Sequence, residues 1–236
     1  MPSPQLRKKA FSLSRYPGAV KAIERLAKKP SPFEPSVLSW DHCDAQVYVE
    51  WFEVPARVIG NVLGKDPAFD LAQRLLFGQD LLDHCLLTGD RPSSVTEQKF
   101  ALDQNLRLHI PLEQVTGLGF ELRGRTDFTT LRFEWEDPLQ TGDAYSTAAL
   151  LSDILRGSPL NQALSEANST RERLSNEFVT KRAELRHQPN PDLSPDMNKV
   201  LSSALHPDPT ARITRFQELR SFYIKASRMM LVDAAT

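Results

Sequence analysis

Residues 145–155 read YSTAALLSDIL, a run that is apolar on nearly every side when it is wound into a helix. No side of such a helix is suited to face water, so we predict that it lies in the centre of a domain. Gly157 and Pro159 follow the run and are expected to end the helix. The fold is therefore expected to be assembled around this segment.

Helices are also predicted on both sides of it. Ser194 is a suitable N-cap and Pro195 suits the first helical position, which predicts a helix from there to about Leu205. Thr214 followed three residues later by Gln217 has the form of a capping box and predicts the last helix.

The N-terminal half mixes helix and strand. Apolar residues at helical spacing predict helices over residues 18–29 and from residue 67 to about residue 87. Residues 37–54 are rich in β-branched and aromatic side chains around a polar turn and predict a β-hairpin, and short strands are expected near residues 99–110 and 129–134. The fold class predicted is α+β, mainly helical.

Composition excludes several classes of protein. Among 236 residues, 40% are hydrophobic and 25% charged, which is typical of a folded domain. The formal net charge is -1, so no overall positive field favours nucleic acid. We expect neither an export signal nor a membrane span, and hence a cytoplasmic protein. Cys43 and Cys85 have no partner at metal-ligand spacing, and no metal site is predicted.

The most specific motif lies near the C-terminus, where residues 204–214 read ALHPDPTARIT. This segment resembles the protein-kinase sequence of leucine, Asp-Pro and arginine that comes just before the last helix of that fold. In kinases the arginine forms a buried ion pair with the glutamate of an Ala-Pro-Glu motif. The resemblance implies a structural pair between Arg212 and Glu136.

Other segments extend the resemblance over roughly residues 17–224. Residues 141–160 are similar to the central buried helix of the kinase C-lobe, which implies a structural role for Asp143 at its start. Residues 47–53 are similar to the strand that enters the interlobe hinge, and residues 68–87 to the long helix before the catalytic loop. The implied architecture is a protein-kinase-like C-lobe with a truncated N-lobe, divided into residues 1–54 and 55–236.

The positions that carry kinase chemistry do not match. Residues 88–95 read TGDRPSSV where the family has its catalytic loop, so that only Asp90 survives, as a relic of the base. Residues 111–113 read PLE where Asp-Phe-Gly belongs. Lys9 is the best candidate for the strand lysine, but only eight residues precede it, too few for two strands and a Gly-rich loop. The resemblance therefore implies a pseudokinase, with no catalytic residue and neither metal nor ATP expected as a cofactor.

Function is expected to be scaffolding, adaptor or allosteric regulation through another protein. Candidates for partner binding are the basic positions Arg171 and Arg182 and the aromatic residues Trp51 and Phe52. Two alternatives remain open. One is an atypical nucleotide-dependent phosphotransferase that uses Asp90 with Glu113 or Asp127, and the other is a helical interaction protein unrelated to kinases.

Overall fold

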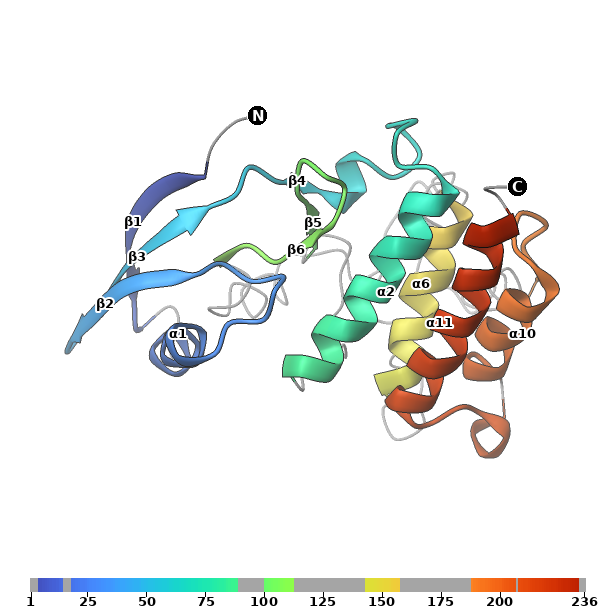
Figure 1. The fold of residues 1–236 in the computed structure, drawn as a ribbon. Coiled ribbons are helices and arrows are strands. Elements are labelled where there is room, and N and C mark those ends of the chain that lie inside the picture. Colours follow the sequence, from blue (N-terminus) through green and yellow to red (C-terminus); the bar gives the residue numbers. More distant parts are fainter. Residues whose placement is uncertain are drawn as a thin grey trace, which may run out of the picture. The chain divides into compact units, whose positions relative to one another are not determined.

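The computed structural model describes residues 4–14, 18–88, 100–112, 143–157, 188–206 and 208–233. In that part of the chain, five α-helices and two antiparallel three-stranded sheets are present (Figure 1). The α+β class is thus confirmed. Backbone contacts divide the chain into two compact units: Met1–Ile59 with Glu97–Thr126, and Gly60–Thr96 with Asp127–Thr236. The predicted division at residues 54 and 55 stays a prediction.

The first sheet contains β1 (Gln5–Ser12), β2 (Val37–Cys43) and β3 (Gln46–Glu53). Its spatial order is β1-β3-β2, and both pairings are antiparallel. The hairpin predicted over residues 37–54 is confirmed as β2 and β3. Strand β1 was not predicted, because only Phe11 among its eight residues is buried and the strand therefore shows no apolar alternation.

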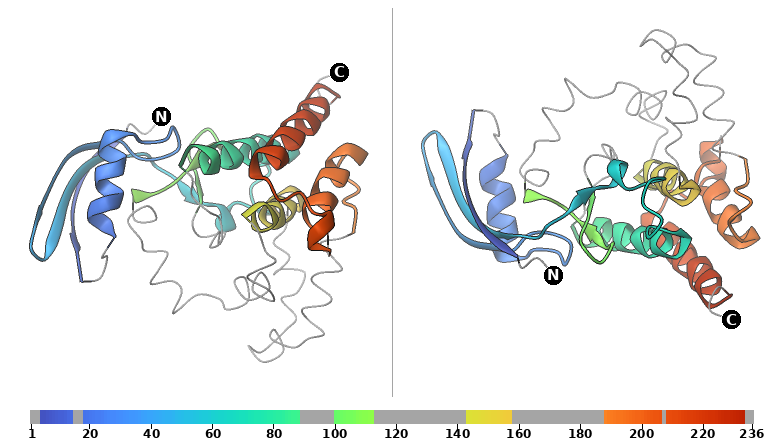
Figure 2. Two further views of the ribbon diagram at one scale, coloured as in Figure 1. Left: turned by 90° about the horizontal axis from the view of Figure 1, so that it is seen from below. Right: turned by 90° about the horizontal axis from the view of Figure 1, so that it is seen from above.

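Helix α1 (Ala19–Lys28) covers one face of this sheet, as Figure 2 shows. Alternate residues of β3 point toward α1 and form a buried cluster with it. The buried members of this cluster, which we call the sheet core, are Phe11, Ala19, Ile23, Leu26, Val47, Val49, Trp51 and Leu112. Helix α1 falls within the predicted range of residues 18–29.

An ion pair fastens α1 to the segment that follows it. Arg25 donates from Nη1 to Oε2 of Glu34 at 2.9 Å and from Nη2 to Oε1 at 2.5 Å. The backbone N–H of Ser31 donates to the same Oε2 at 2.9 Å, and the Glu34 side chain is only 1% exposed. A bidentate pair of this kind fixes geometry as well as charge, so it sets where the chain leaves α1 and turns toward β2.

The second sheet is small. It pairs β4 (Arg57–Val58) with β5 (Ala101–Leu102), and β5 with β6 (Leu108–His109), all antiparallel. The β5–β6 turn is closed by Asp103, whose Oδ1 accepts from the backbone N–H groups of Asn105 at 2.8 Å and Arg107 at 2.9 Å. The predicted strands near residues 99–110 are confirmed, while residues 129–134 lie outside the described part.

The helical unit is built around α6 (Asp143–Arg156). After the short 3-10 helix η1 (Ile59–Asn61), the chain forms α2 (Leu71–Thr88), and after α6 it forms α10 (Pro195–Ala204), η3 (Pro209–Ala211) and α11 (Phe216–Asp233). Helix α6 contacts α2, α10 and α11 (Figure 1). Buried residues lie on several sides of α6, which confirms that the apolar run is a core helix.

Local signals explain the ends of these helices. Ser194 caps α10 by accepting from the Met197 N–H at 3.2 Å, with Pro195 in the first turn, as predicted. Gly157 ends α6 with a φ of +74°, which favours glycine. Helix α11 begins at Phe216, so Arg215, rather than the predicted Thr214, is the residue before its first turn.

Helices α2 and α11 meet at a glycine. A Cβ built on Gly78 would lie 2.0 Å from the hydroxyl of Tyr223. Tyr223 is fully buried and donates to the carbonyl of Leu75 at 3.3 Å, and burial raises the pKa of its phenol far above the ordinary value. Gln79 donates to Ser227 at 2.7 Å across the same contact. Glycine therefore permits the close approach of the two helices.

Within the described residues, no helix is both long and apolar enough to cross a lipid bilayer.

Candidate functional site

The structure does not describe four of the predicted site residues. Asp90, Glu136, Arg171 and Arg182 lie outside the described ranges, as do Glu113 and Asp127 of the phosphotransferase alternative. Asp143 is the first residue of α6, but its side chain is outside the described part. The predicted roles of all these residues remain predictions.

Arg212 is described and half-buried. Its guanidinium lies over the ring of Tyr145 in the first turns of α6, with 4.5 Å between the guanidinium carbon and the ring centre. Its Nε donates to the carbonyl oxygen of His206. Arg212 thus joins the loop after α10 to the beginning of the central helix. The predicted partner Glu136 lies outside the described residues, so the ion pair itself is untested.

The loop that presents Arg212 is ordered by short-range hydrogen bonds. Oδ1 of Asp208 accepts from the hydroxyl of Thr210 at 2.8 Å and from its backbone N–H at 2.9 Å. These bonds, the hydroxyl first, hold the pKa of Asp208 below its ordinary value. The N–H of Ile213 donates to the carbonyl of Ser203 at 3.1 Å and so ties the loop to α10.

The prediction that Trp51 is available to a partner is wrong, because its side chain is buried. Trp51 and Phe52 are both predicted to bind a partner, which requires exposed side chains, but Trp51 is 3% exposed and belongs to the sheet core, whereas Phe52 is 44% exposed. Adjacent residues of a strand point to opposite faces, so only one of the two can lie on the surface when α1 covers the other face. Phe52 is the one available to a partner.

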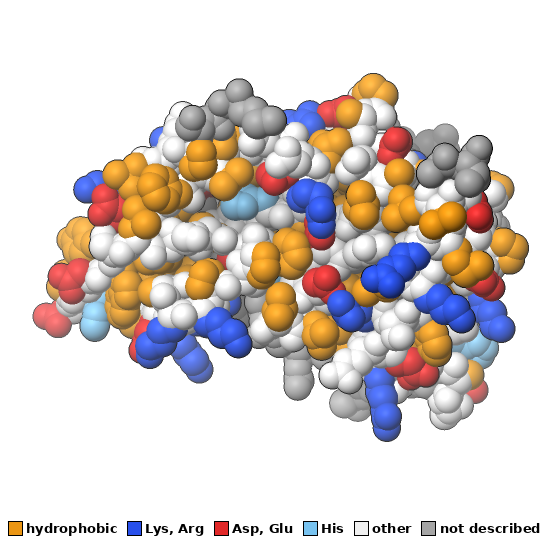
Figure 3. All heavy atoms as spheres, viewed as in Figure 1, with side chains coloured by type: hydrophobic (Ala, Val, Ile, Leu, Met, Phe, Trp, Pro, Cys, Tyr) orange, Lys and Arg blue, Asp and Glu red, His pale blue; other side chains and the backbone are white. Residues whose placement is uncertain are grey.

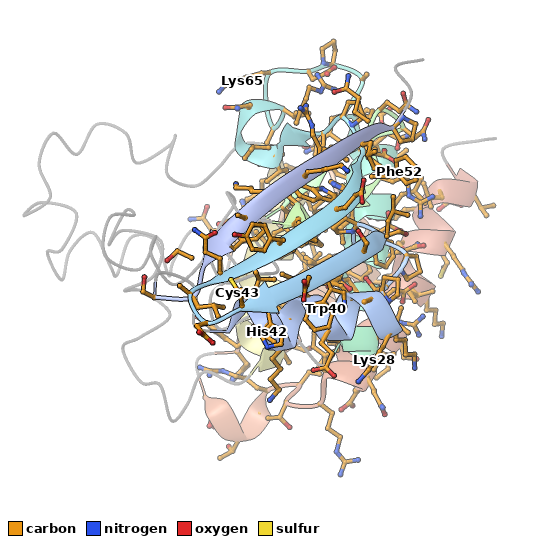
Figure 4. All side chains as sticks on the ribbon, turned by 90° about the vertical axis from the view of Figure 1, so that its left-hand side faces the viewer. Lys28, Trp40, His42, Cys43, Phe52 and Lys65 are labelled. Carbon is orange, nitrogen blue, oxygen red and sulfur yellow. The ribbon has the colours of Figure 1, made fainter. Side chains whose placement is uncertain are left out.

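The face of the sheet opposite α1 carries half-exposed apolar side chains. Phe52 lies opposite Leu6 in the register of β1 and β3, and Tyr48 lies opposite Ala10. Leu6, Tyr48 and Phe52 are each about half exposed. Figure 4 views the sheet from this side, with Phe52 on β3 and both Trp40 and His42 on β2. We call the residues Leu6, Lys8, Ser39, Tyr48, Glu50 and Phe52 the outer sheet face.

Charged residues cross the middle of the outer sheet face. Lys8 pairs with Glu50 at 2.9 Å, and the hydroxyl of Ser39 donates to the other carboxylate oxygen at 2.9 Å. The bond to Lys8, followed by that to Ser39, lowers the pKa of Glu50. A shallow hollow of about 430 Å³ lies along these residues. Figure 3, which views the sheet from its edge, shows hydrophobic and charged side chains side by side at the left of the molecule, where the strands lie.

A second groove, of about 530 Å³, lies between α10 and α11. Its apolar lining comes from Val200, Ile213, Phe222 and Ala226, and its charged lining includes both signs. Phe222 is 44% exposed. The groove is a candidate surface, without a charge pattern that selects a ligand.

The described residues offer no metal centre, since no group of three or more His, Cys, Asp or Glu side chains is placed to hold an ion. His109 on β6 is buried, and burial lowers the pKa of its imidazole. Its Nε2 has no hydrogen-bond partner. We therefore expect His109 to influence the stability of the fold. In the described part of the chain, no further side chains are placed around it to bind a metal ion.

The chain matches no protein-family model, and no curated protein is similar enough to it to be counted as a relative.

Proposed function

We propose that this chain is a noncatalytic domain of protein-kinase-like architecture that acts by binding another protein. The observation that carries the proposal is the position of Leu112. Residues 111–113 stand where the kinase resemblance puts the metal-binding Asp-Phe-Gly, and Leu112 is fully buried in the sheet core. Pro111 and Leu112 have no side-chain atom that binds magnesium, so neither can serve as a metal ligand, and Leu112 contributes packing instead.

The order of the elements supports the kinase-like part of the proposal. Helix α1 and the β2–β3 hairpin are followed by α2, α6, α10 and α11, the order on which the resemblance rests. Asp143 opens α6, and Arg212 precedes α11 and reaches back to Tyr145 on α6. These positions agree with the two C-terminal motifs from which the resemblance was drawn.

The ion pairs of α1 support the noncatalytic part. Active kinases need an ion pair between a strand lysine and a glutamate on the adjacent helix. Glu24 is the only glutamate of α1, and it pairs with Lys28 of the same helix at 2.6 Å.

The outer sheet face supports a protein as the partner. Half-exposed leucine and aromatic side chains beside a paired lysine and glutamate form the mixture of apolar and polar groups found at protein interfaces. Tyrosine and phenylalanine are enriched in such interfaces because they bury much area with few rotatable bonds. Phe52 and Tyr48 are the residues that we expect to contribute most to binding.

The noncatalytic part is tested by thermal unfolding of the full chain with ATP, with and without magnesium or manganese. A ligand that binds only the folded state raises the melting temperature at concentrations well above its Kd. We expect no change under any of these conditions. A metal-dependent rise would contradict the proposal and favour the phosphotransferase alternative, with Asp90→Ala as the next variant.

The partner-binding part is tested by placing a photo-crosslinking residue at Phe52 in one variant and at Asp44 in another. Asp44 is exposed in the turn between β2 and β3, so it serves as a control from the same sheet. We expect a single defined adduct from position 52, lost when Leu6→Asp is added, and none from position 44. Equal labelling at both positions, or none at either, would contradict the proposed surface.

A further inference from the structure

A cavity of about 250 Å³ lies between the C-terminal end of α6, the segment that leads into α10, and α10 itself. Its polar lining includes Ser152, Arg156, Gln188, Asn190, Lys199 and Ser202. Two of its lining residues are cationic, and none of its described lining residues is acidic. The cavity is separate from the outer sheet face and has no part in the proposed function.

Asn190 contributes a buried donor that lacks an acceptor. The residue is 5% exposed, and its Nδ2 has no hydrogen-bond partner. Its Oδ1 accepts from the N–H of Asp192 at 3.1 Å, and its backbone N–H and carbonyl bind the side chain of Asn198 at 2.8 and 2.9 Å. Because Oδ1 is engaged, rotating the amide by 180° would break one bond without gaining a better arrangement. The free donor is thus fixed by its surroundings.

Arg156 contributes a second such donor. Its Nη2 donates to the carbonyl of Gln188, while its buried Nε has no acceptor. A guanidinium can still use its other N–H groups, and it suits the planar or tetrahedral oxygens of an oxyanion. Lys199 adds an exposed ammonium at the edge of the cavity. The lining thus combines two donors that lack acceptors with two positive charges, and its described residues include no carboxylate.

The N-terminus of helix α10 also favours negative charge in the cavity. Pro195, the first residue of this ten-residue helix, lines the cavity, so the positive end of the helix dipole lies beside it, with part of its charge offset by Asp196 in the same turn. A cavity of this size is smaller than the pockets that enclose drug-sized ligands, which limits the occupant to a small group.

We propose that this cavity binds a small oxyanion, the phosphate or carboxylate group of a ligand, through Arg156, Asn190 and Lys199. Binding requires a small side-chain adjustment that turns the two buried N–H groups toward the anion. Both donors then gain the acceptor that they lack, and the ligand's negative charge balances the two cations. A neutral or cationic group would not balance the two positive charges.

The proposal is tested by two-dimensional NMR titration of the full chain, following the side-chain N–H signals of Arg156 and Asn190. Inorganic phosphate represents a free anion, methyl phosphate an esterified one and acetate a carboxylate, each added against sodium chloride at matched ionic strength. We expect the chemical shifts of both signals to change saturably with at least one of the three anions. The anion that binds most tightly shows whether the site takes free phosphate, a phosphate ester or a carboxylate. Shifts that only track ionic strength would overturn the proposal, since water or an adventitious ion would then suffice.

Two variants and a control make the test specific. Asn190→Asp keeps the oxygen that Asp192 needs and replaces the free amide donor by a carboxylate oxygen, so binding should weaken by about tenfold or more. Lys199→Gln changes an exposed side chain and should weaken binding without unfolding the helix. Lys225→Gln removes an exposed lysine from the groove between α10 and α11 and should leave binding unchanged. Equal binding by all three variants would overturn the assignment to this cavity.

Discussion

The guanidinium carbon of Arg212 lies 4.5 Å from the centre of the Tyr145 ring, and this contact connects the loop before α11 to the central helix α6. Both residues are half-buried, and the Nε of Arg212 also donates to the carbonyl of His206. The Arg212 side chain therefore makes one contact within its own loop, to His206, and one with the central helix, to Tyr145.

Arg212→Ala should therefore destabilise the fold. Loss of the cation–π contact and of one hydrogen bond costs about 1–3 kcal/mol, and a buried ion pair with Glu136 would raise the cost to about 3–5 kcal/mol. Chemical unfolding of Arg212→Ala, Glu136→Gln and the double variant separates the two cases. Additive losses would argue against the Glu136 pair and for a fold unrelated to kinases, whereas a large coupling energy would support the kinase-like reading.

Gly78→Ala should destabilise the contact between α2 and α11. Alanine favours helix by about 1 kcal/mol over glycine, but the new Cβ would lie 2.0 Å from the Tyr223 hydroxyl, in a buried position. Overpacking of this kind costs about 1–3 kcal/mol, so we expect a net loss of stability. Adding Tyr223→Phe removes the closest atom and should recover part of the loss. A Gly78→Ala variant that is more stable than the parent would contradict this contact.

Trp51→Ala and Phe52→Ala form a matched pair on neighbouring positions of β3. Trp51 is in the sheet core, so its truncation should cost about 3–5 kcal/mol. Phe52 is 44% exposed and lies opposite Leu6 in the strand register, so its truncation should cost less than about 1 kcal/mol. Urea unfolding measures both. Similar losses for the two variants would contradict the orientation of β3.

His109 should make stability fall in mild acid. Burial lowers the pKa of His109, with opposing effects from Glu53 and Asp103, so the folded state favours the neutral ring. The unfolded chain then binds more protons as the pH falls through the ordinary value of 6.5. The stabilisation is present above that pH and is lost below it, down to the pKa of the folded state.

Urea unfolding of the parent and of His109→Phe between neutral and mildly acidic pH tests this expectation. The difference in unfolding free energy between the two proteins should change in favour of the variant as the pH is lowered, because phenylalanine has no proton to bind. A difference that stays constant with pH would show that the ring is protonated as easily in the folded protein as in the unfolded chain.

Local sequence was sufficient to predict those helices and strands whose formation depends on residues close together in the chain. The all-round apolar run of α6, the Ser194-Pro195 start of α10 and the β2–β3 hairpin were each predicted in type and approximate position, because caps, turns and periodicity act over a few residues. The kinase resemblance also came from local motifs, and it remains a proposal.

Tertiary structure decided the features that depend on which surface becomes covered. Strand β1 exists because β3 offers it an edge, although its own sequence has a single buried residue. Trp51 is buried and Phe52 exposed because α1 covers only one face of the sheet. The unsatisfied donors of Asn190 and Arg156 meet at one cavity only when α6 and α10 pack together. Such relations join residues far apart in sequence, where packing energy rather than local preference selects the arrangement.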